Sequence, residues 1–236
     1  IVAHLLVLRG IENFDDAKLF FRPELKHLHD PFLMKNMQDA VDRIEKAIAN
    51  KEKVLVYGDY DVDGTTSVAM MYSFLKRFSP EIEYYIPCRY EEGYGISLKG
   101  IDYAKKNNFS LIITLDCGIR AFDQVDYANE KEVDFIICDH HNPADKIPNA
   151  IAILNPKQSD CNYPYKELSG CGVGFKLIQA YSQKNNIDFS EISEYLDLLT
   201  VSIGADIVPM TGENRVFSYF GLKQINTQPR AGLKAL

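Results

Sequence analysis

Short apolar runs alternate with amphipathic stretches along most of the chain. Runs such as LIITL at 111–115 and FIIC at 135–138 are almost entirely apolar, which is typical of strands buried on both faces. The stretches between these runs repeat apolar residues at helical spacing. The pattern therefore predicts an α/β fold, in which a mostly parallel sheet carries helices on both faces.

The same pattern predicts where the elements lie. We expect strands over 54–57, 82–87, 111–115, 135–138 and 150–154. We expect helices over 15–50, 65–78, 97–107, 121–131, 173–184 and 190–203, with Ser97 as an N-cap. The domain prediction is an N-terminal helical segment at residues 1–50 that packs on a catalytic domain at 51–236.

Acidic and histidine side chains follow three of the predicted strands directly, and one more carboxylate follows the last predicted helix. They are Asp59, Asp61 and Asp63, then Asp116, then Asp139, His140 and His141, and finally Asp206. In a parallel sheet with helices on both faces, ligands bind outside the carboxyl ends of the strands. We therefore expect these side chains to lie together at one edge of the sheet.

So many carboxylates at one edge would repel one another, and some would keep their protons. A divalent cation removes that repulsion, and carboxylate oxygen with imidazole nitrogen suits Mn²⁺ or Mg²⁺. A carboxylate that bridges two ions makes a two-metal site of the kind that hydrolyses phosphodiesters. Each motif alone also fits a turn or a helix cap. Because all of them converge on one edge, we favour the metal site.

Charge and cysteine content narrow the function further. The net charge is −7, so nucleic acid would have to bind through a local groove, through metal, or through a part of a longer protein. The five cysteines are scattered without a CxxC pair, which indicates reduced thiols and a cytoplasmic protein rather than a zinc knuckle. No apolar run approaches the ~20 residues of a membrane-spanning helix.

The motifs GDYDVDG at 58–64, LDCG at 115–118, DHH at 139–141 and GADIVP at 204–209 resemble those of the DHH phosphoesterase family, in order and spacing. Closer features, IPCRYEEGYGIS at 86–97 and SGCGVGFKL at 169–177, look like its RecJ-like exonuclease branch. This resemblance covers essentially the whole chain. It implies a 5′-to-3′ exonuclease that acts on single-stranded DNA, releases 5′-mononucleotides and serves DNA repair and recombination.

The resemblance also implies roles for individual residues. One ion would be held by Asp59, Asp61 and Asp116, and the other by Asp63, Asp116, His140 and Asp206, with Asp116 bridging. His141 would contact the scissile phosphate or position the nucleophile, while Asp139 would orient a histidine. Small-molecule members of the family carry a histidine where this chain has Tyr57, so the first ion's ligands are the least defined.

Three further residues are candidates for substrate binding. Arg89 precedes a glycine-rich turn and would grip phosphate, although a solvated surface arginine explains it too. Gly172 and Gly174 resemble a phosphate-binding loop at a helix start, although tight helix packing explains them equally well.

Two other functions stay open at this point. One is a phosphodiesterase for short oligonucleotides or cyclic dinucleotides. The other is a non-catalytic replication scaffold, which the filled motif positions disfavour because such relatives have lost ligands. The resemblance further implies a DHH-associated domain and an oligonucleotide-binding fold, which we expect to be absent from this chain. We expect single-stranded DNA as the partner, while a single-strand-binding protein or a helicase partner is undefined.

Overall fold

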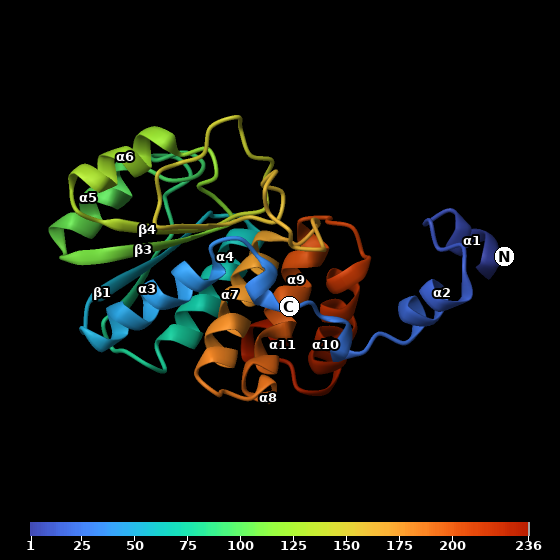
Figure 1. The fold of residues 1–236 in the computed structure, drawn as a ribbon. Coiled ribbons are helices and arrows are strands. Elements are labelled where there is room, and N and C mark those ends of the chain that lie inside the picture. The colour runs from blue at the N-terminus through green and yellow to red at the C-terminus, as the bar shows by residue number, and fades with distance from the viewer. Residues whose placement is uncertain (236) are drawn as a thin grey trace.

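The computed structural model describes residues 1–235, and a five-stranded parallel sheet forms its centre (Figure 1). The strand order is β2-β1-β3-β4-β5, and all neighbouring pairs are parallel. The strands are β1 Lys53–Gly58, β2 Ile82–Tyr85, β3 Phe109–Leu115, β4 Asp134–Cys138 and β5 Ala152–Leu154. The predicted α/β fold with a parallel sheet is confirmed.

The register makes the three central strands end level with one another. Gly58 of β1 pairs with Leu115 of β3, and Leu115 pairs with Cys138 of β4. The next residue along each strand therefore emerges at the same edge of the sheet. The strand order also reverses at β1 and β3, and sheets of this kind bind ligands at that reversal.

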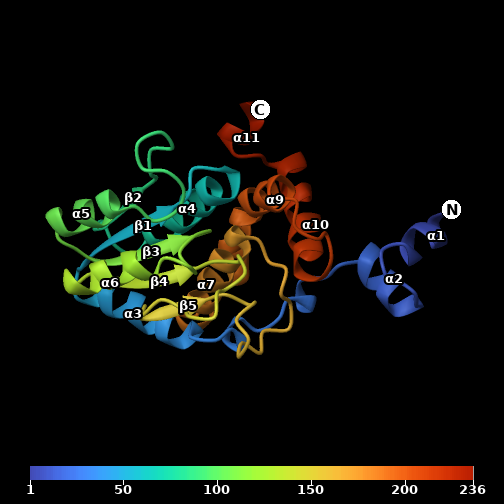
Figure 2. The same ribbon diagram turned by 90° about the horizontal axis from the view of Figure 1, so that it is seen from above.

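Helices cover both faces of the sheet, as Figures 1 and 2 show. One face packs on α5 Leu98–Lys106 and α6 Phe122–Glu130. The other face packs on α3 Met37–Ala49, α4 Val62–Leu75 and α7 Gly170–Lys184, with α9 Leu196–Ala205 against α4 and α7. Each face has its own apolar core, because successive strand residues point to opposite sides.

The remaining helices lie nearer the two ends of the chain. They are α1 Val2–Val7, α2 Phe14–Phe21, α8 Phe189–Ile192, α10 Gly212–Thr227 and α11 Ala231–Ala235, with short 3-10 turns at Leu25–His27, Pro31–Leu33 and Ser193–Tyr195. No described helix combines the length and the apolar character that crossing a membrane requires.

Two predicted helices are broken into shorter elements, and one observed helix was not predicted. The single helix over 15–50 is broken after α2, where Pro23 and Pro31 cannot donate a helical hydrogen bond. The helix over 190–203 is instead α8, a 3-10 turn and α9, and α10 was not predicted at all.

The N-terminal segment does not pack as one unit. The packing predicted for residues 1–50 applies to α3, whereas α1 and α2 contain no buried residue and extend away from the sheet (Figure 1). The boundary at residue 50 stays a prediction.

Candidate metal centre

Three aspartates emerge directly after the three central strands. Asp59 follows β1, Asp116 follows β3 and Asp139 follows β4, and all three are buried. Asp116 has a φ of 61°, a left-handed conformation that aspartate tolerates better than most residues. Its N–H donates to the carbonyl of Cys138 at 2.9 Å, which ties the end of β3 to the end of β4. The backbone thus turns all three carboxyl groups to one edge.

The start of α4 contributes two further carboxylates. Asp61 is its N-cap and accepts a hydrogen bond from the N–H of Gly64 at 2.9 Å. Asp63, in the first turn, is buried. A side chain at position 64 would clash, because its Cβ would lie 2.5 Å from the carbonyl oxygen of Asp59. Gly64 therefore allows α4 to start directly beside the end of β1.

The carboxylate of Asp63 is held by the N-terminus of α7. It accepts hydrogen bonds from the N–H groups of Gly170 at 2.7 Å and Cys171 at 2.8 Å, and from the hydroxyl of Ser202 at 2.7 Å. Backbone N–H groups at a helix start favour a negative charge. Asp63 is thereby fixed beside Asp116 without a basic side chain.

Gly170 is a site residue that the sequence analysis missed. A Cβ at this position would lie 2.6 Å from the Cβ of Asp116, so no larger residue lets α7 approach so closely. The glycines at alternate positions in SGCGVG were the available signal, but they drew attention to Gly172 and Gly174 instead.

The structure places these two glycines in packing contacts. Gly172 donates its N–H to the capping hydroxyl of Ser169, and a Cβ there would meet Leu168 at 3.3 Å. A Cβ at Gly174 would lie 2.9 Å from Leu115. Both are buried, which fits the helix-packing alternative, and the substrate-binding role predicted for them stays a prediction.

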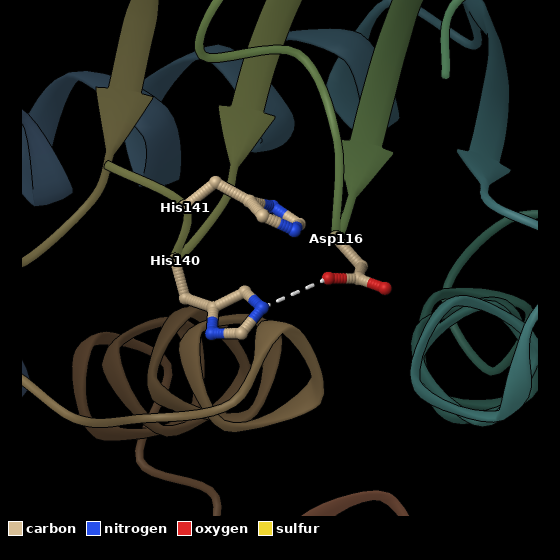
Figure 3. Close-up of side chains that lie close together, drawn as sticks. All are labelled: Asp116, His140 and His141. Carbon is tan, nitrogen blue, oxygen red and sulfur yellow. Dashed lines mark ion pairs between the residues drawn. The ribbon is translucent and has the colours of Figure 1, made fainter. Parts of the chain in front are cut away.

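His140 is the centre of the acidic cluster. Its Nε2 lies 3.2 Å from Oδ1 of Asp116, 3.6 Å from Oδ2 of Asp206 and 3.9 Å from Oδ2 of Asp63. Figure 3 shows His140 and His141 leaving the same turn in different directions, with His140 joined to Asp116. Within the described chain, these atoms of Asp116, His140 and Asp206 are buried and have no hydrogen-bond partner.

Charge repulsion and burial shift the pKa values of these carboxyl groups. Burial raises the pKa of Asp116 to about 10, and the negative charges of Asp63 and Asp61 add to the shift. Burial likewise raises the pKa of Asp206 and of Asp59. Without a cation, then, Asp116 keeps its proton at neutral pH.

A divalent cation fits this arrangement. Two sets of potential ligand atoms each lie within 4.8 Å of one another, namely Asp63, His140 and Asp206, and Asp116, His140 and His141. An ion would give the unpartnered oxygens and nitrogen a contact and would neutralise the repelling charges. Oxygen ligands with one imidazole suit Mn²⁺ or Mg²⁺.

Asp59 and Asp61, which are predicted to hold the first ion together with Asp116, do not belong to a close set of ligand atoms among the described residues. Over residues 1–235, neither set includes Asp59 or Asp61. Asp59 accepts hydrogen bonds from the N–H groups of Tyr60 at 2.7 Å and Gly95 at 3.2 Å, while Asp61 caps α4. Both carboxylates therefore lie at the edge of the sheet, where they accept hydrogen bonds from backbone N–H groups.

Asp139 fixes the orientation of His141. Its Oδ1 lies 2.8 Å from Nδ1 of His141 and also accepts the N–H groups of both histidines, while Oδ2 accepts the N–H of Ile119 at 2.8 Å. Burial alone would raise the pKa of Asp139, but these hydrogen bonds and the charge of His141 outweigh it and lower the pKa. The hydrogen bond to Asp139 raises the pKa of His141 against the effect of burial.

His141 and Arg89 are the accessible polar groups beside the cluster. The side chain of His141 is 45% exposed, and its Nε2 lies 3.5 Å from the hydroxyl of Tyr94. The guanidinium of Arg89 lies 5.1 Å over the ring of Tyr60, the residue that follows Asp59. Arg89 is exposed and forms no ion pair with any described carboxylate, so its hydrogen-bond donors are free.

Comparisons with known proteins agree with this geometry. The sequence model of the "DHH family, N-terminal domain" matches residues 53–203. The single-stranded-DNA-specific exonuclease RecJ of Bacillus subtilis is 43% identical over the whole chain, and that of Escherichia coli is 35% identical over 86% of it. The chain spans only 29% and 37% of the lengths of these two relatives.

Solved structures show the same likeness. Exonuclease RecJ bound to manganese matches with a TM-score of 0.80 and 29% identity, over 90% of this chain and 52% of that one. RecJ in complex with Mn²⁺ from Thermus thermophilus matches with a TM-score of 0.79 and 26% identity, over 98% of this chain and 32% of that one. From its sequence match over residues 53–203, the chain belongs to the DHH family.

Proposed function

We propose that this chain is the catalytic domain of a metal-dependent exonuclease that degrades single-stranded DNA from 5′ to 3′ and releases 5′-mononucleotides. The observation that carries the proposal is the convergence of buried, unpartnered ligand atoms of Asp116, His140 and Asp206 on one point. The RecJ relatives, two of them solved with manganese, support the substrate and the metal.

The ligands divide between two Mn²⁺ or Mg²⁺ ions. Asp63, Asp116, His140 and Asp206 would hold one ion, and Asp59, Asp61 and Asp116 would hold the other, so that Asp116 would belong to both sets. When bound, the ions lower the pKa of a coordinated water and stabilise charge on the phosphodiester oxygens. The set that contains His140 is supported by distances of 3.2–3.9 Å from its three carboxylates to Nε2 of His140, whereas the set that contains Asp59 and Asp61 rests on position at the sheet edge.

Two side chains of the protein act on the phosphate itself. Asp139 holds His141 through Nδ1, which leaves Nε2 directed away from Asp139 and available to the scissile phosphate or to the nucleophile. Arg89 contributes a planar fork of donors that matches phosphate oxygens. The exposure of His141 and Arg89 and the hydrogen bond between His141 and the buried Asp139 support these roles.

The cellular location and the binding partner are part of the same proposal. All five cysteines lie within the described residues as free thiols, which fits the reducing cytoplasm where we place the protein. Single-stranded DNA is the proposed partner, and because the net charge of the chain is −7, the DNA would bind through a local groove, through the metal ions, or through a part of a longer protein.

The test is degradation of a single strand that carries a label at either its 5′ or its 3′ end, with Mn²⁺ and with chelator. We expect Mn²⁺-dependent release of a labelled mononucleotide first from the 5′-labelled strand. His140→Asn should abolish it, while His4→Asn, the same change on exposed α1, should not. Early mononucleotide release from the 3′ label would refute the direction. Cleavage of dinucleotides but not of long strands would instead select the short-oligonucleotide function.

A further inference from the structure

Asp206 reaches the acidic cluster from a different kind of element than the other aspartates. It is the C-cap of α9, whereas Asp59, Asp116 and Asp139 each follow a strand. The register of the sheet therefore does not fix Asp206, and its place depends on the segment between α9 and α10, at 207–211. We call this segment the α9–α10 turn.

Burial holds little of the α9–α10 turn in place. Val208 packs on the apolar core, but Ile207 and Met210 are 87% and 40% exposed. Ile207 also has a φ of 57°, a left-handed conformation that is unfavourable for a β-branched residue. A turn that is exposed and strained at its first residue needs a restraint from outside, because Oδ2 of Asp206 has to stay 3.6 Å from Nε2 of His140.

Two side chains donate to one carbonyl in the middle of this turn. The hydroxyl of Tyr165 and Nδ2 of Asn214 each lie 3.1 Å from the carbonyl oxygen of Pro209. Tyr165 belongs to the loop before α7, and Asn214 to the first turn of α10, where its Nδ2 also donates to the carbonyl of Glu167. A Cβ at Gly212 would lie 2.5 Å from the ring of Tyr165, so the chain passes directly against that ring.

The loop before α7 and the start of α10 are both tied to α7 through Glu213. This carboxylate accepts a hydrogen bond from Nζ of Lys176 on α7 at 3.0 Å, and another from the hydroxyl of Tyr163 in the loop at 2.6 Å. Both donor side chains are fully buried. The N-terminus of α7 also holds Asp63. Two proposed ligands of the same ion, Asp63 and Asp206, are therefore placed relative to one helix.

We propose that Tyr165 and Asn214 are positioning residues, which fix Asp206 for the metal ion through the carbonyl of Pro209. This inference rests on the proposed function, because it takes Asp206 as a metal ligand. Oδ1 of Asn214 is buried and has no hydrogen-bond partner within residues 1–235, an unfavourable state that an apolar side chain would avoid. An amide kept there at such a cost fits a need for its donor atom, Nδ2.

Calorimetric titration of the metal-free chain with Mn²⁺ tests the inference. Asn214→Ala should raise Kd about tenfold, the low end of the loss when an outer hydrogen bond of a metal site is removed. Tyr165→Phe removes one of the two donors and keeps the ring against Gly212, so it should raise Kd roughly threefold. Tyr127→Phe, which loses a hydroxyl hydrogen bond to Asp102 on the other face of the sheet, is the matched control and should leave Kd unchanged.

The same two substitutions in an Asp206→Asn background separate positioning from a general loss of structure. If Tyr165 and Asn214 act through the Asp206 carboxylate, neither substitution weakens Mn²⁺ binding further once that carboxylate is gone. Tyr165→Phe decides the matter by itself if Asn214→Ala does not fold. Equal increases of Kd in the two backgrounds, or an unchanged Kd in Tyr165→Phe, would overturn the inference alone. Mn²⁺ binding by Asp206→Asn that matches the unmodified chain would refute the proposed ligand set, and the inference with it.

Discussion

Charged side chains at the amino ends of the central strands have ionic partners, whereas two buried side chains at the carboxyl ends, those of Asp116 and His140, have atoms without a partner among the described residues. At the amino ends, Arg43 of α3 donates from Nε to Asp134 and from a terminal nitrogen to Glu52, each at 2.7 Å. Ser110 donates to the same Glu52 oxygen. At the carboxyl ends, Asp116 and His140 have buried atoms that no described group satisfies. One end is thus charge-compensated by the protein itself, and the other is arranged for a cation from solution.

The pKa values of two carboxyl groups express this difference. Burial tends to raise the pKa of Glu52, but Ser110 and Arg43 outweigh it and lower the pKa to about 2. Burial and the neighbouring carboxylates raise the pKa of Asp116 to about 10. Both groups flank the same sheet, so the presence of a basic partner decides whether the pKa is lowered or raised. The amino end thus stabilises the fold, whereas the carboxyl end is less stable until a cation binds.

The largest effect should come from removing the bridging charge. Asp116→Asn should lower Mn²⁺-dependent hydrolysis roughly 10³-fold or more, because each ion supplies several kcal/mol of transition-state stabilisation. The metal-free protein should be as stable as before, or more stable, because a repelled buried carboxyl group is gone. Turnover and chemical denaturation measured on one preparation check both. Unchanged turnover would show that Asp116 does not bridge the ions.

The next largest effect belongs to the amino end. Arg43→Met should lower the free energy of unfolding by about 3 kcal/mol, the low end for breaking a buried pair, because Arg43 is 8% exposed but its partners Glu52 and Asp134 are 19% and 38% exposed and keep part of their hydration. Turnover per folded molecule should be kept. Arg77→Met, which breaks the exposed pair with Glu191, is the control and should cost less than about 1 kcal/mol. Equal losses in the two variants would contradict the contrast between the two ends.

Metal binding should raise the free energy of unfolding by slightly less than Arg43→Met lowers it. At a free Mn²⁺ concentration of 100 times Kd, the expected gain is about 2.7 kcal/mol. Thermal unfolding with Mn²⁺ and with chelator measures it. The gain should be strongly reduced in Asp116→Asn and kept in Arg43→Met, because only the first change touches a ligand. A full gain in Asp116→Asn would place the ion elsewhere.

The sheet and its functional edge were predictable from the sequence because both depend on local pattern. Apolar runs marked β3 and β4, and the polar residue after each run marked Asp116 and Asp139. The predicted helix over 15–50 is wrong because the prediction gave more weight to the apolar spacing than to Pro23 and Pro31, which interrupt a helix. α2 and α3, which lie on either side of these two prolines, are helical as predicted.

What the sequence did not reveal depends on contacts between distant segments. α10 was missed because Glu213 in its first turn is 1% exposed and pairs with the buried Lys176 of α7 at 3.0 Å. A pattern of apolar and polar positions reads such a glutamate as solvent-exposed. The close approach of Gly170 to Asp116 likewise forms only when α7 is placed against the sheet.

The smallest expected effect, at most about 1.4 kcal/mol per pH unit for each group, is on the pH dependence of stability in the metal-free protein. Glu52 has a folded pKa of about 2 against 4.5 unfolded, so its contribution is complete above pH 4.5 and is lost as pH falls toward 2. Asp116 has a folded pKa of about 10 against 3.8 unfolded, so its contribution is complete below pH 3.8 and is lost as pH rises toward 10.

The contributions of Glu52 and Asp116 to stability should therefore be distinguishable by varying the pH. In chelator, Glu52→Gln should make the loss of stability between pH 4.5 and 2 less steep and leave the alkaline side unchanged. Asp116→Asn should do the reverse, flattening the decline from pH 3.8 toward 10. Denaturant midpoints measured across this range, with Lys26→Gln as an exposed control, decide it. If Asp116→Asn flattened the acid side instead, a cationic partner would already compensate that carboxylate, and the contrast between the two ends would fail.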